Sequence, residues 1–230
     1  MALDNMPNQN TKLIIWIVVV IVVLATAGLI VLGIMQPPTT QTTPISSTLV
    51  PAITSSDNTE GNLNAKVSLI EYGDFQCPAC GAYYPMVKQL VAAYSGKIAF
   101  AFRNYPLPQH ADAPLASQAA EAAGLQGKYW QMHDALYENQ SVWSAAPTST
   151  VVSQFFDNYA SSLGINVAQL NTDMNSAKVL NKIQSDISSG NAVPLQYTPT
   201  FFINLKQISN PTSYDQFKSD IDQALSATGS

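Results

Sequence analysis

Three short apolar runs along the chain predict strands that are buried inside a sheet. They are Val67–Tyr72, Ile98–Phe102 and Thr200–Ile203. Apolar runs this short, bounded by turn residues, are typical of strands covered on both faces. Between the first two runs, large apolar residues recur at helical spacing from Pro78 to Tyr94. The pattern therefore predicts a strand–helix–strand unit.

The long stretch between residues 103 and 199 is patterned mainly for helices. Apolar residues recur every three or four positions, and Gly127, Gly164 and Gly190 separate the segments. The expected helices are Leu115–Gln126, Lys128–Glu138, Thr150–Leu163, Val167–Met174 and Ala177–Ser188. Strands followed by this block of helices predict an α/β fold with a helical insertion over about residues 110–190.

A different pattern at the N-terminus predicts attachment to a membrane. Leu13–Met35 is 23 residues long and has no charged residue, which is long enough to span a bilayer. No clear small-x-small cleavage site ends it, so we interpret it as an uncleaved transmembrane anchor; a cleaved signal peptide is the alternative. Residues 36–62 are rich in Thr, Ser and Pro and predict a linker, which leaves residues 63–230 as the folded domain.

The distribution of charge sets the expected orientation. Lys12 is the only basic residue before the span, and none lies from Gln36 to Ala65. Basic residues favour the cytoplasmic side, so residues 1–12 are expected to form a cytoplasmic tail. The domain would then lie outside the cytoplasm on a single-pass anchor in the cell membrane. The chain has a net charge of −5 and no basic run, which argues against nucleic acid as a partner.

The only two cysteines, Cys77 and Cys80, lie one helical turn apart at the first strand-to-helix junction. Pro78 suits the first helical position, because its missing N–H would have no intrahelical partner there. Cys77 then faces the positive end of the helix dipole, which stabilises a thiolate, and Cys80 can reach its sulfur. The spacing predicts dithiol–disulfide chemistry in which Cys77 attacks and Cys80 resolves.

Two other uses of the cysteines fit the sequence less well. A structural disulfide across so short a loop would constrain the unfolded chain very little. A zinc site needs two further ligands, and the only histidines, His110 and His133, lack finger-like spacing. We therefore expect neither a metal nor a cofactor, and we expect both histidines to be structural.

Several segments around the cysteines follow one another in the order of a known family. They are Glu71–Cys80, Phe102–Leu107, Ala119–Gly124, Gly127–Asp134 and Thr198–Asn204. Over most of residues 65–226, the chain resembles the DsbA-like branch of the thioredoxin superfamily, in its membrane-anchored form. The resemblance implies a thioredoxin-like fold with an inserted helical domain, in agreement with the pattern above.

The resemblance also implies roles for three further residues. Pro199 would be a cis-proline that faces the cysteines and leaves the backbone of Thr198 free to pair with a substrate strand. An ordinary trans proline at the start of a strand is the alternative. Glu71 would be buried and would accept a proton from Cys80; a strand-edge glutamate in solvent is the alternative.

The segment between the cysteines differs from that of the family's strongest oxidants. Those proteins have histidine where this chain has Ala79, so Pro78 and Ala79 would tune the redox potential without that side chain. We expect a lowered pKa for Cys77, but not the value near 3.5 of the most oxidising members. Tyr197 stands where relatives often have glycine, which alters the expected shape of the substrate groove.

The expected function is that of a membrane-tethered dithiol oxidase that introduces disulfides into exported proteins with free thiols. By the same resemblance, a quinone-linked DsbB-like or VKOR-like membrane protein would reoxidise it. A disulfide reductase or isomerase with the same residues is the alternative within this class. A tethered, chaperone-like module that binds peptides is the alternative from another class.

Overall fold

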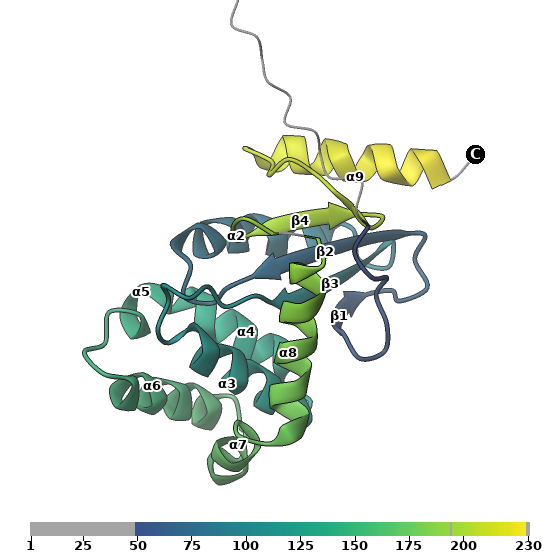
Figure 1. Cartoon of the computed structure of the whole chain (residues 1–230). Helices are drawn as coiled ribbons and strands as arrows, with labels where there is room; N and C mark the ends of the chain where they lie inside the picture. Colours follow the sequence, from purple (N-terminus) through teal and green to yellow (C-terminus); the bar gives the residue numbers. More distant parts are fainter. Residues whose placement is uncertain (1–48, 194, 229–230) are drawn as a thin grey trace, which may run out of the picture. The chain divides into compact units, whose positions relative to one another are not determined.

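A five-stranded sheet with the strand order β1-β3-β2-β4-β5 is the centre of the fold (Figure 1). The computed structural model describes residues 49–193 and 195–228. The strands are β1 (Asn58–Gly61), β2 (Val67–Gly73), β3 (Ile98–Asn104), β4 (Thr200–Ile203) and β5 (Lys206–Gln207). β2 and β3 are parallel, and the other neighbours are antiparallel. The three apolar runs of the sequence are confirmed as the inner strands β3, β2 and β4.

The helices complete a thioredoxin-like α/β fold with a helical insertion. α2 (Pro78–Ala93) connects β2 to β3, and α9 (Tyr214–Thr228) ends the described chain. The insertion contains α3 (Ala113–Leu125), α4 (Tyr129–Glu138), α5 (Gln140–Trp143), α6 (Ser149–Ser162), α7 (Val167–Asp173) and α8 (Ala177–Asn191). The helical insertion is confirmed, with its helices lying between Ala113 and Asn191, and the single turn α5 is the helix that the pattern did not predict.

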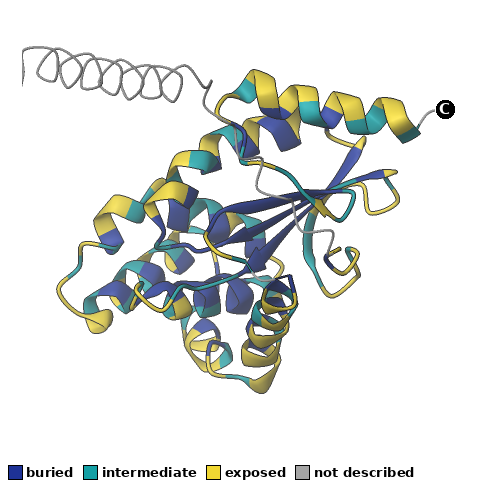
Figure 2. Ribbon diagram, turned by 45° about the horizontal axis from the view of Figure 1, so that its top comes forward, coloured by how far each residue is buried: buried dark blue, intermediate teal, exposed yellow. Residues whose placement is uncertain are grey.

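Side-chain alternation along the strands divides the core into two parts. On one face, Leu69 of β2 packs with phenylalanines of β3 and β4 under α2, α4 and α9. On the other face, Ile70 and Tyr72 pack with Phe202 and with Val50 from the chain before β1. Figure 2 shows the inner strands β2, β3 and β4 buried along almost all of their length, while the outer faces of the helices are exposed.

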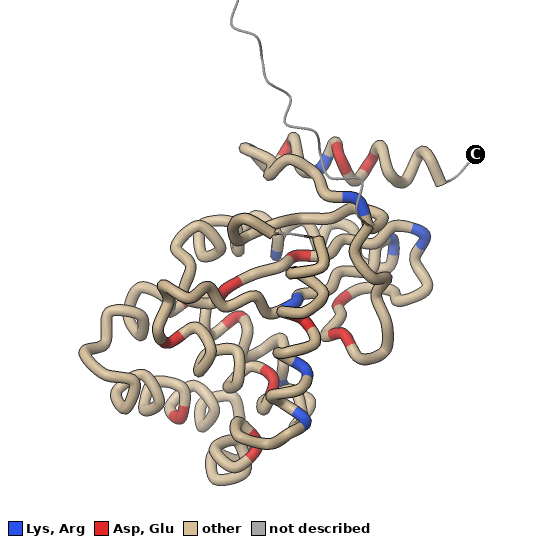
Figure 3. The backbone as a smooth tube through the Cα atoms, viewed as in Figure 1, with Lys and Arg blue, Asp and Glu red and all other residues tan. Residues whose placement is uncertain are grey.

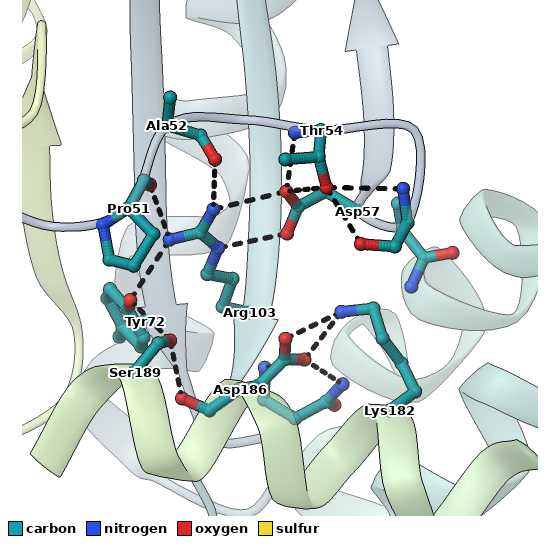
Figure 4. Close-up of polar contacts among 12 residues, drawn as sticks. Pro51, Ala52, Thr54, Asp57, Tyr72, Arg103, Lys182, Asp186 and Ser189 are labelled. Atoms are coloured by element: carbon teal, nitrogen blue, oxygen red, sulfur yellow. Dashed lines mark hydrogen bonds and ion pairs between the residues drawn. The ribbon is translucent and has the colours of Figure 1, made fainter.

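The structure corrects the expected boundary between the linker and the domain. Residues 49–62, which fall in the predicted linker, belong to the fold: Val50 is buried and β1 pairs with β3. The guanidinium of Arg103 on β3 donates to the carbonyls of Pro51 and Ala52 and to the carboxylate of Asp57 (Figure 4). These hydrogen bonds join the segment to a residue about 50 positions away along the chain, and the hydrophobic pattern of the segment itself cannot reveal them.

The predicted cytoplasmic tail, residues 1–12, and the predicted anchor, residues 13–35, lie outside the described residues, as does the linker up to residue 48. Within residues 49–193 and 195–228, no helix is both long enough and apolar enough to cross a membrane.

Charged residues in the described part of the chain are distributed along the backbone over many elements (Figure 3). Several lysines form local ion pairs, such as Lys88 with Asp134 and Lys218 with Asp222. Two charged side chains of the central strands are almost fully buried, Glu71 on β2 and Arg103 on β3. The first of them belongs to the site described next.

Candidate active site

The two cysteines lie where β2 ends and α2 begins, as the sequence predicted. Cys77 is the N-cap residue of α2, with extended backbone, and Pro78 follows as the first helical residue. Both cysteines are free thiols. Cys80 is fully buried, whereas Cys77 retains 7% of its surface and lines a groove. One sulfur is therefore accessible and the other is enclosed.

The surroundings of the two thiols separate their acidities. The neighbouring Cys80 thiol has the largest effect on Cys77: together with Thr198 and the backbone N–H groups of Cys80 and Ala79, it outweighs burial and lowers the pKa of Cys77 to about 5. Burial, together with the hydrogen bond to Cys77 and the charge of Glu71, raises the pKa of Cys80 well above its ordinary value. At neutral pH, Cys77 is a thiolate and Cys80 keeps its proton.

The loop before β4 faces the cysteines. The peptide bond between Thr198 and Pro199 is cis, and the Cys77 sulfur lies 3.4 Å from the carbonyl oxygen of Thr198. The Asn210 side-chain amide donates to the carbonyl of Pro199 at 2.7 Å and holds the loop from the other side. The structure thus brings Thr198 and Pro199 to the cysteine pair, where the resemblance had placed them.

Two buried carboxyl groups lie beside the cysteines, and their environments differ. Both oxygens of Asp74 accept hydrogen bonds: from the backbone N–H groups of Gln76 and Leu107, and from His110 Nδ1 at 2.7 Å. Within the described chain, the Glu71 carboxyl makes no hydrogen bond, and burial raises its pKa to about 8. Glu71 can therefore change its protonation near neutral pH, whereas the Asp74 carboxyl has hydrogen-bond donors on both of its oxygens.

Asp74 is a residue of the site that the sequence analysis missed. Its Oδ1 also accepts from the backbone N–H of Cys77, and its own N–H lies 3.5 Å from the Cys80 sulfur. An aspartate that bonds to N–H groups two and three residues ahead forms a local turn. The signal was present in the sequence, since Gly73-Asp74 directly follows the apolar strand.

A second missed residue comes from the insertion. The side-chain amide of Gln140 in α5 donates to the carbonyls of Phe75 at 2.7 Å and Cys77 at 2.9 Å. Gly81 in α2 leaves room for this approach, because a Cβ there would lie 2.2 Å from Gln140 Oε1 and would displace the amide. No local pattern could show this contact, since 63 residues separate Gln140 from Cys77.

A groove of about 700 Å³ opens beside Cys77. Its wall contains Thr198 and the exposed Tyr197, together with Leu107, Ile187 and Leu195. Among its described lining residues, His110 is the one titratable side chain other than tyrosine and cysteine. The groove offers an apolar surface to a polypeptide whose sulfur reaches Cys77.

The two histidines have different surroundings. His110 lines the groove and bonds to Asp74. His133 of α4 is buried among aromatic rings, with Phe102, Trp130 and Tyr137 about 5 Å away by ring centroids. Burial lowers the pKa of His133, so its ring is neutral at pH 7.

Comparisons with known proteins agree with this architecture. The thioredoxin family model matches residues 54–223, which is more than half of the chain. BdbD from Bacillus subtilis, in its oxidised form, superposes with a TM-score of 0.68 at 23% identity, covering 79% of this chain and 98% of that one. The alpha-DsbA1 structure from Wolbachia pipientis superposes with a TM-score of 0.66 at 21% identity, covering 78% and 94%.

Curated relatives with similar sequences carry another kind of name. A protein named Na(+)/H(+) antiporter NhaA 1 from Mycolicibacterium gilvum is 32% identical over 160 residues, which is 67% of this chain and 24% of that protein. Its namesake from Salinispora arenicola is 29% identical over 181 residues, 78% of this chain and 26% of that protein. The chain thus spans about a quarter of the length of these relatives. On the family match and the fold, the chain belongs to the thioredoxin family and has the DsbA-like form in which helices interrupt the thioredoxin core.

Proposed function

We propose that the protein is a membrane-tethered thiol–disulfide oxidoreductase that works outside the cytoplasm, in the direction of disulfide formation. The observation that carries the proposal is the asymmetry of the two thiols. Cys77 has a pKa of about 5 and opens to a groove, whereas Cys80 is enclosed with a raised pKa beside an unpaired carboxyl group. An accessible thiolate and an enclosed thiol suit the nucleophilic and resolving roles.

The proposed reaction starts from the Cys77–Cys80 disulfide. A substrate thiolate attacks the Cys77 sulfur, the bond between the two cysteines breaks, and Cys80 leaves as a thiolate that takes a proton from Glu71. A second substrate thiolate then attacks the substrate sulfur of the mixed disulfide. The substrate disulfide forms and Cys77 leaves as a stabilised thiolate. The substrate loses two electrons and the enzyme gains them.

The low pKa of Cys77 supports the oxidative direction. Stabilising the thiolate stabilises the reduced enzyme, which makes its disulfide a stronger oxidant. A pKa of about 5 lies between the values of about 7 for thioredoxin and about 3.5 for DsbA. We therefore expect a reduction potential between those of the two proteins.

The proposed partners follow from this direction. Substrates would be exported proteins with free thiols, which present an extended segment to the cis-proline loop and the apolar groove. The proposed anchor, residues 13–35, would hold the domain in the same membrane as a quinone-linked, DsbB-like or VKOR-like reoxidant and raise their effective concentration.

The reduction potential of the full chain tests the proposed direction. The protein, in detergent micelles, is equilibrated with glutathione buffers and its cysteines are then alkylated and counted. A potential between about −120 and −200 mV supports disulfide donation. A value near −270 mV or below points to a reductase.

The Cys77→Ser variant separates exchange chemistry from peptide binding alone. The apolar groove could hold a polypeptide without any reaction at the cysteines. We expect the variant to lose substrate oxidation completely, with Ser153→Ala on the exposed side of α6 as the matched control. Full function of the Cys77→Ser protein would instead establish a peptide-binding module.

A further inference from the structure

A small cavity connects the buried Glu71 carboxyl to a charged patch of the surface. It lies between β2, α2 and α4, with a volume of about 50 Å³. Glu71 and Tyr137 line it inside the protein, and Lys88, Asp134 and Glu60 line it where it meets solvent. At roughly 15 Å³ for each molecule, the cavity has room for about three waters.

The wall of this cavity contains buried polar atoms that lack a partner. In the described part of the chain, His133 Nε2 and the Tyr137 hydroxyl are buried without any hydrogen bond. His133 uses its other nitrogen, Nδ1, which lies 3.2 Å from Asp134 Oδ1. Buried polar groups are rarely left unpaired, and a polar cavity of this size is where water satisfies them. The His133 imidazole therefore contacts both the cavity and the Asp134 carboxylate, and the Asp134 side chain is one-third exposed.

The proposed thiol chemistry needs a path along which protons move between the buried Glu71 carboxyl and solvent. Cys80 is fully buried, so the proton that it exchanges with Glu71 cannot reach solvent directly. Asp74, the other carboxyl beside the cysteines, is occupied by its N–H donors. A route from Glu71 to the surface must therefore follow the cavity.

We propose that His133, together with Asp134, relays protons between Glu71 and solvent through this cavity, and that the exchange steps of Cys80 depend on the relay for their rate. The inference rests on the proposed function. His133 acts through Glu71 and does not contact the reacting sulfurs.

The relay can be written as balanced steps. When Cys80 attacks a mixed disulfide on Cys77, its proton goes to Glu71, the Cys77–Cys80 bond forms, and the partner leaves as a thiolate. Glu71 then passes the proton through water to His133 Nε2, while Nδ1–H releases a proton to Asp134. In the opposite half of the cycle, Cys80 leaves as a thiolate and a proton returns along the same path. The return restores the original tautomer of His133.

The environment of His133 suits a neutral relay. Burial lowers its pKa, so Nε2 keeps a lone pair that can accept a proton at pH 7. The other titratable and charged groups that face the cavity come from two strands and two helices around it. They are Glu60 of β1, Glu71 of β2, Tyr84 and Lys88 of α2, and Asp134 and Tyr137 of α4.

The test measures the Cys80 step by itself. The reduced full chain is mixed with oxidised glutathione, quenched in acid at successive times, alkylated and weighed by mass spectrometry. Formation of the mixed disulfide reports the attack by Cys77, and its disappearance reports the resolution by Cys80. In His133→Phe, which keeps an aromatic ring in the cluster, we expect resolution to slow about tenfold at pH 7 with unchanged attack.

Two controls separate proton transfer from packing. Tyr129→Phe removes another unpaired buried hydroxyl from the same helix, outside the cavity wall, and should leave both rates unchanged. His133→Ala should be slow, and imidazole in the buffer should restore its resolution rate.

The wild-type protein gives a test that does not depend on a variant folding. In D₂O, resolution should slow about twofold or more, while attack by the Cys77 thiolate should not change. The relay would be overturned if His133→Phe resolved the mixed disulfide at the wild-type rate with the wild-type dependence on pH. It would also be overturned if D₂O left the resolution rate of the wild-type protein unchanged. If wild type forms no mixed disulfide with glutathione, the proposed function itself fails, which is a distinguishable result.

Discussion

Glu71 and Arg103 are buried ionisable residues on neighbouring parallel strands, but within the part of the chain that the structure describes only the Arg103 side chain has hydrogen-bond partners. Glu71 is paired with Phe102, and Arg103 with Tyr72, so the two side chains lie on opposite faces of the sheet. The Arg103 guanidinium donates to two carbonyls, a carboxylate and a tyrosine hydroxyl. In the described chain the Glu71 carboxyl has no hydrogen-bond partner.

This difference in hydrogen bonding gives the two residues different roles: Arg103 stabilises the fold as a permanent charge, whereas Glu71 can change its charge. Full pairing keeps Arg103 and Asp57 ionised: burial opposes the charge of Asp57, but Arg103 outweighs it and lowers the pKa of Asp57. Burial without pairing raises the pKa of Glu71 to about 8, so it can take up and release a proton near pH 7. We therefore expect substitution of Arg103 to lower the free energy of unfolding and substitution of Glu71 to raise it.

Arg103→Met should have the largest effect, a loss of about 3–5 kcal/mol in the free energy of unfolding, because it leaves the Asp57 carboxylate buried without its cation. Urea unfolding of the full chain measures this. Arg103→Lys keeps the charge but not the planar fork, so it should lose less. A loss below about 1 kcal/mol for Arg103→Met would show that the pairing is not structural.

Glu71→Gln should act in the opposite direction and stabilise the protein at pH 7. The carboxyl binds its proton more tightly in the folded state than in the unfolded state, so its ionisation costs stability between pH 4.5 and about 8. At about 1.4 kcal/mol for each pH unit above 4.5, the gain at pH 7 is about 3 kcal/mol.

The pH dependence of this gain is the check. Urea unfolding of wild type and Glu71→Gln should coincide near pH 4.5, diverge as the pH rises and stay parallel above pH 8. The variant should also resolve mixed disulfides more slowly, because Cys80 loses its proton acceptor. If Glu71→Gln were less stable than wild type at pH 7, the unpaired Glu71 carboxylate would not be the cost to stability that we infer.

Asp57→Asn should cost about 2 kcal/mol at neutral pH, since Arg103 keeps its carbonyl and hydroxyl acceptors. The folded-state pKa of Asp57 is lowered, so its carboxylate contributes stability above the unfolded pKa near 3.8 and loses that contribution as the pH falls through the folded value. The loss relative to wild type should therefore shrink in acid, whereas Glu71→Gln gives a gain in stability at neutral pH that also disappears in acid. Unfolding curves between pH 2.5 and 7 distinguish the two signs.

Tyr72→Phe should have the smallest effect, about 1 kcal/mol, because it removes one acceptor for Arg103 and one hydrogen bond to Ser189. Its reduction potential should equal that of wild type, since the ring lies on the face opposite Glu71. A shifted potential would show that the two faces are coupled.

The sequence was sufficient for features that depend on local pattern. The apolar strands, the helices of the insertion and the helix that starts at Pro78 follow from residue spacing, and the structure has them. The positions of Thr198 and Pro199 beside the cysteines came from the resemblance, since nothing local links residues that are 121 positions apart.

What could not be predicted depends on contacts between distant segments. Residues 49–62 resemble a linker because their place in the fold is set by Arg103, and Gln140 reaches the cysteine loop from another helix. The cavity beside Glu71 is formed by helices and strands whose packing no local pattern specifies. Asp74 is the exception, since Gly73–Gln76 already has the sequence of a turn and only the contacts of Asp74 with the cysteine loop were missed.

The approach of Gln140 to Gly81 has a consequence for how relatives of this chain can diverge. A side chain at position 81 would meet the glutamine amide, which would have to move, whereas glycine at 81 leaves position 140 free to change. Lineages that retain glutamine at 140 should therefore retain glycine at 81. The constraint runs in one direction, from the insertion to α2, the helix that begins beside the reactive sulfur.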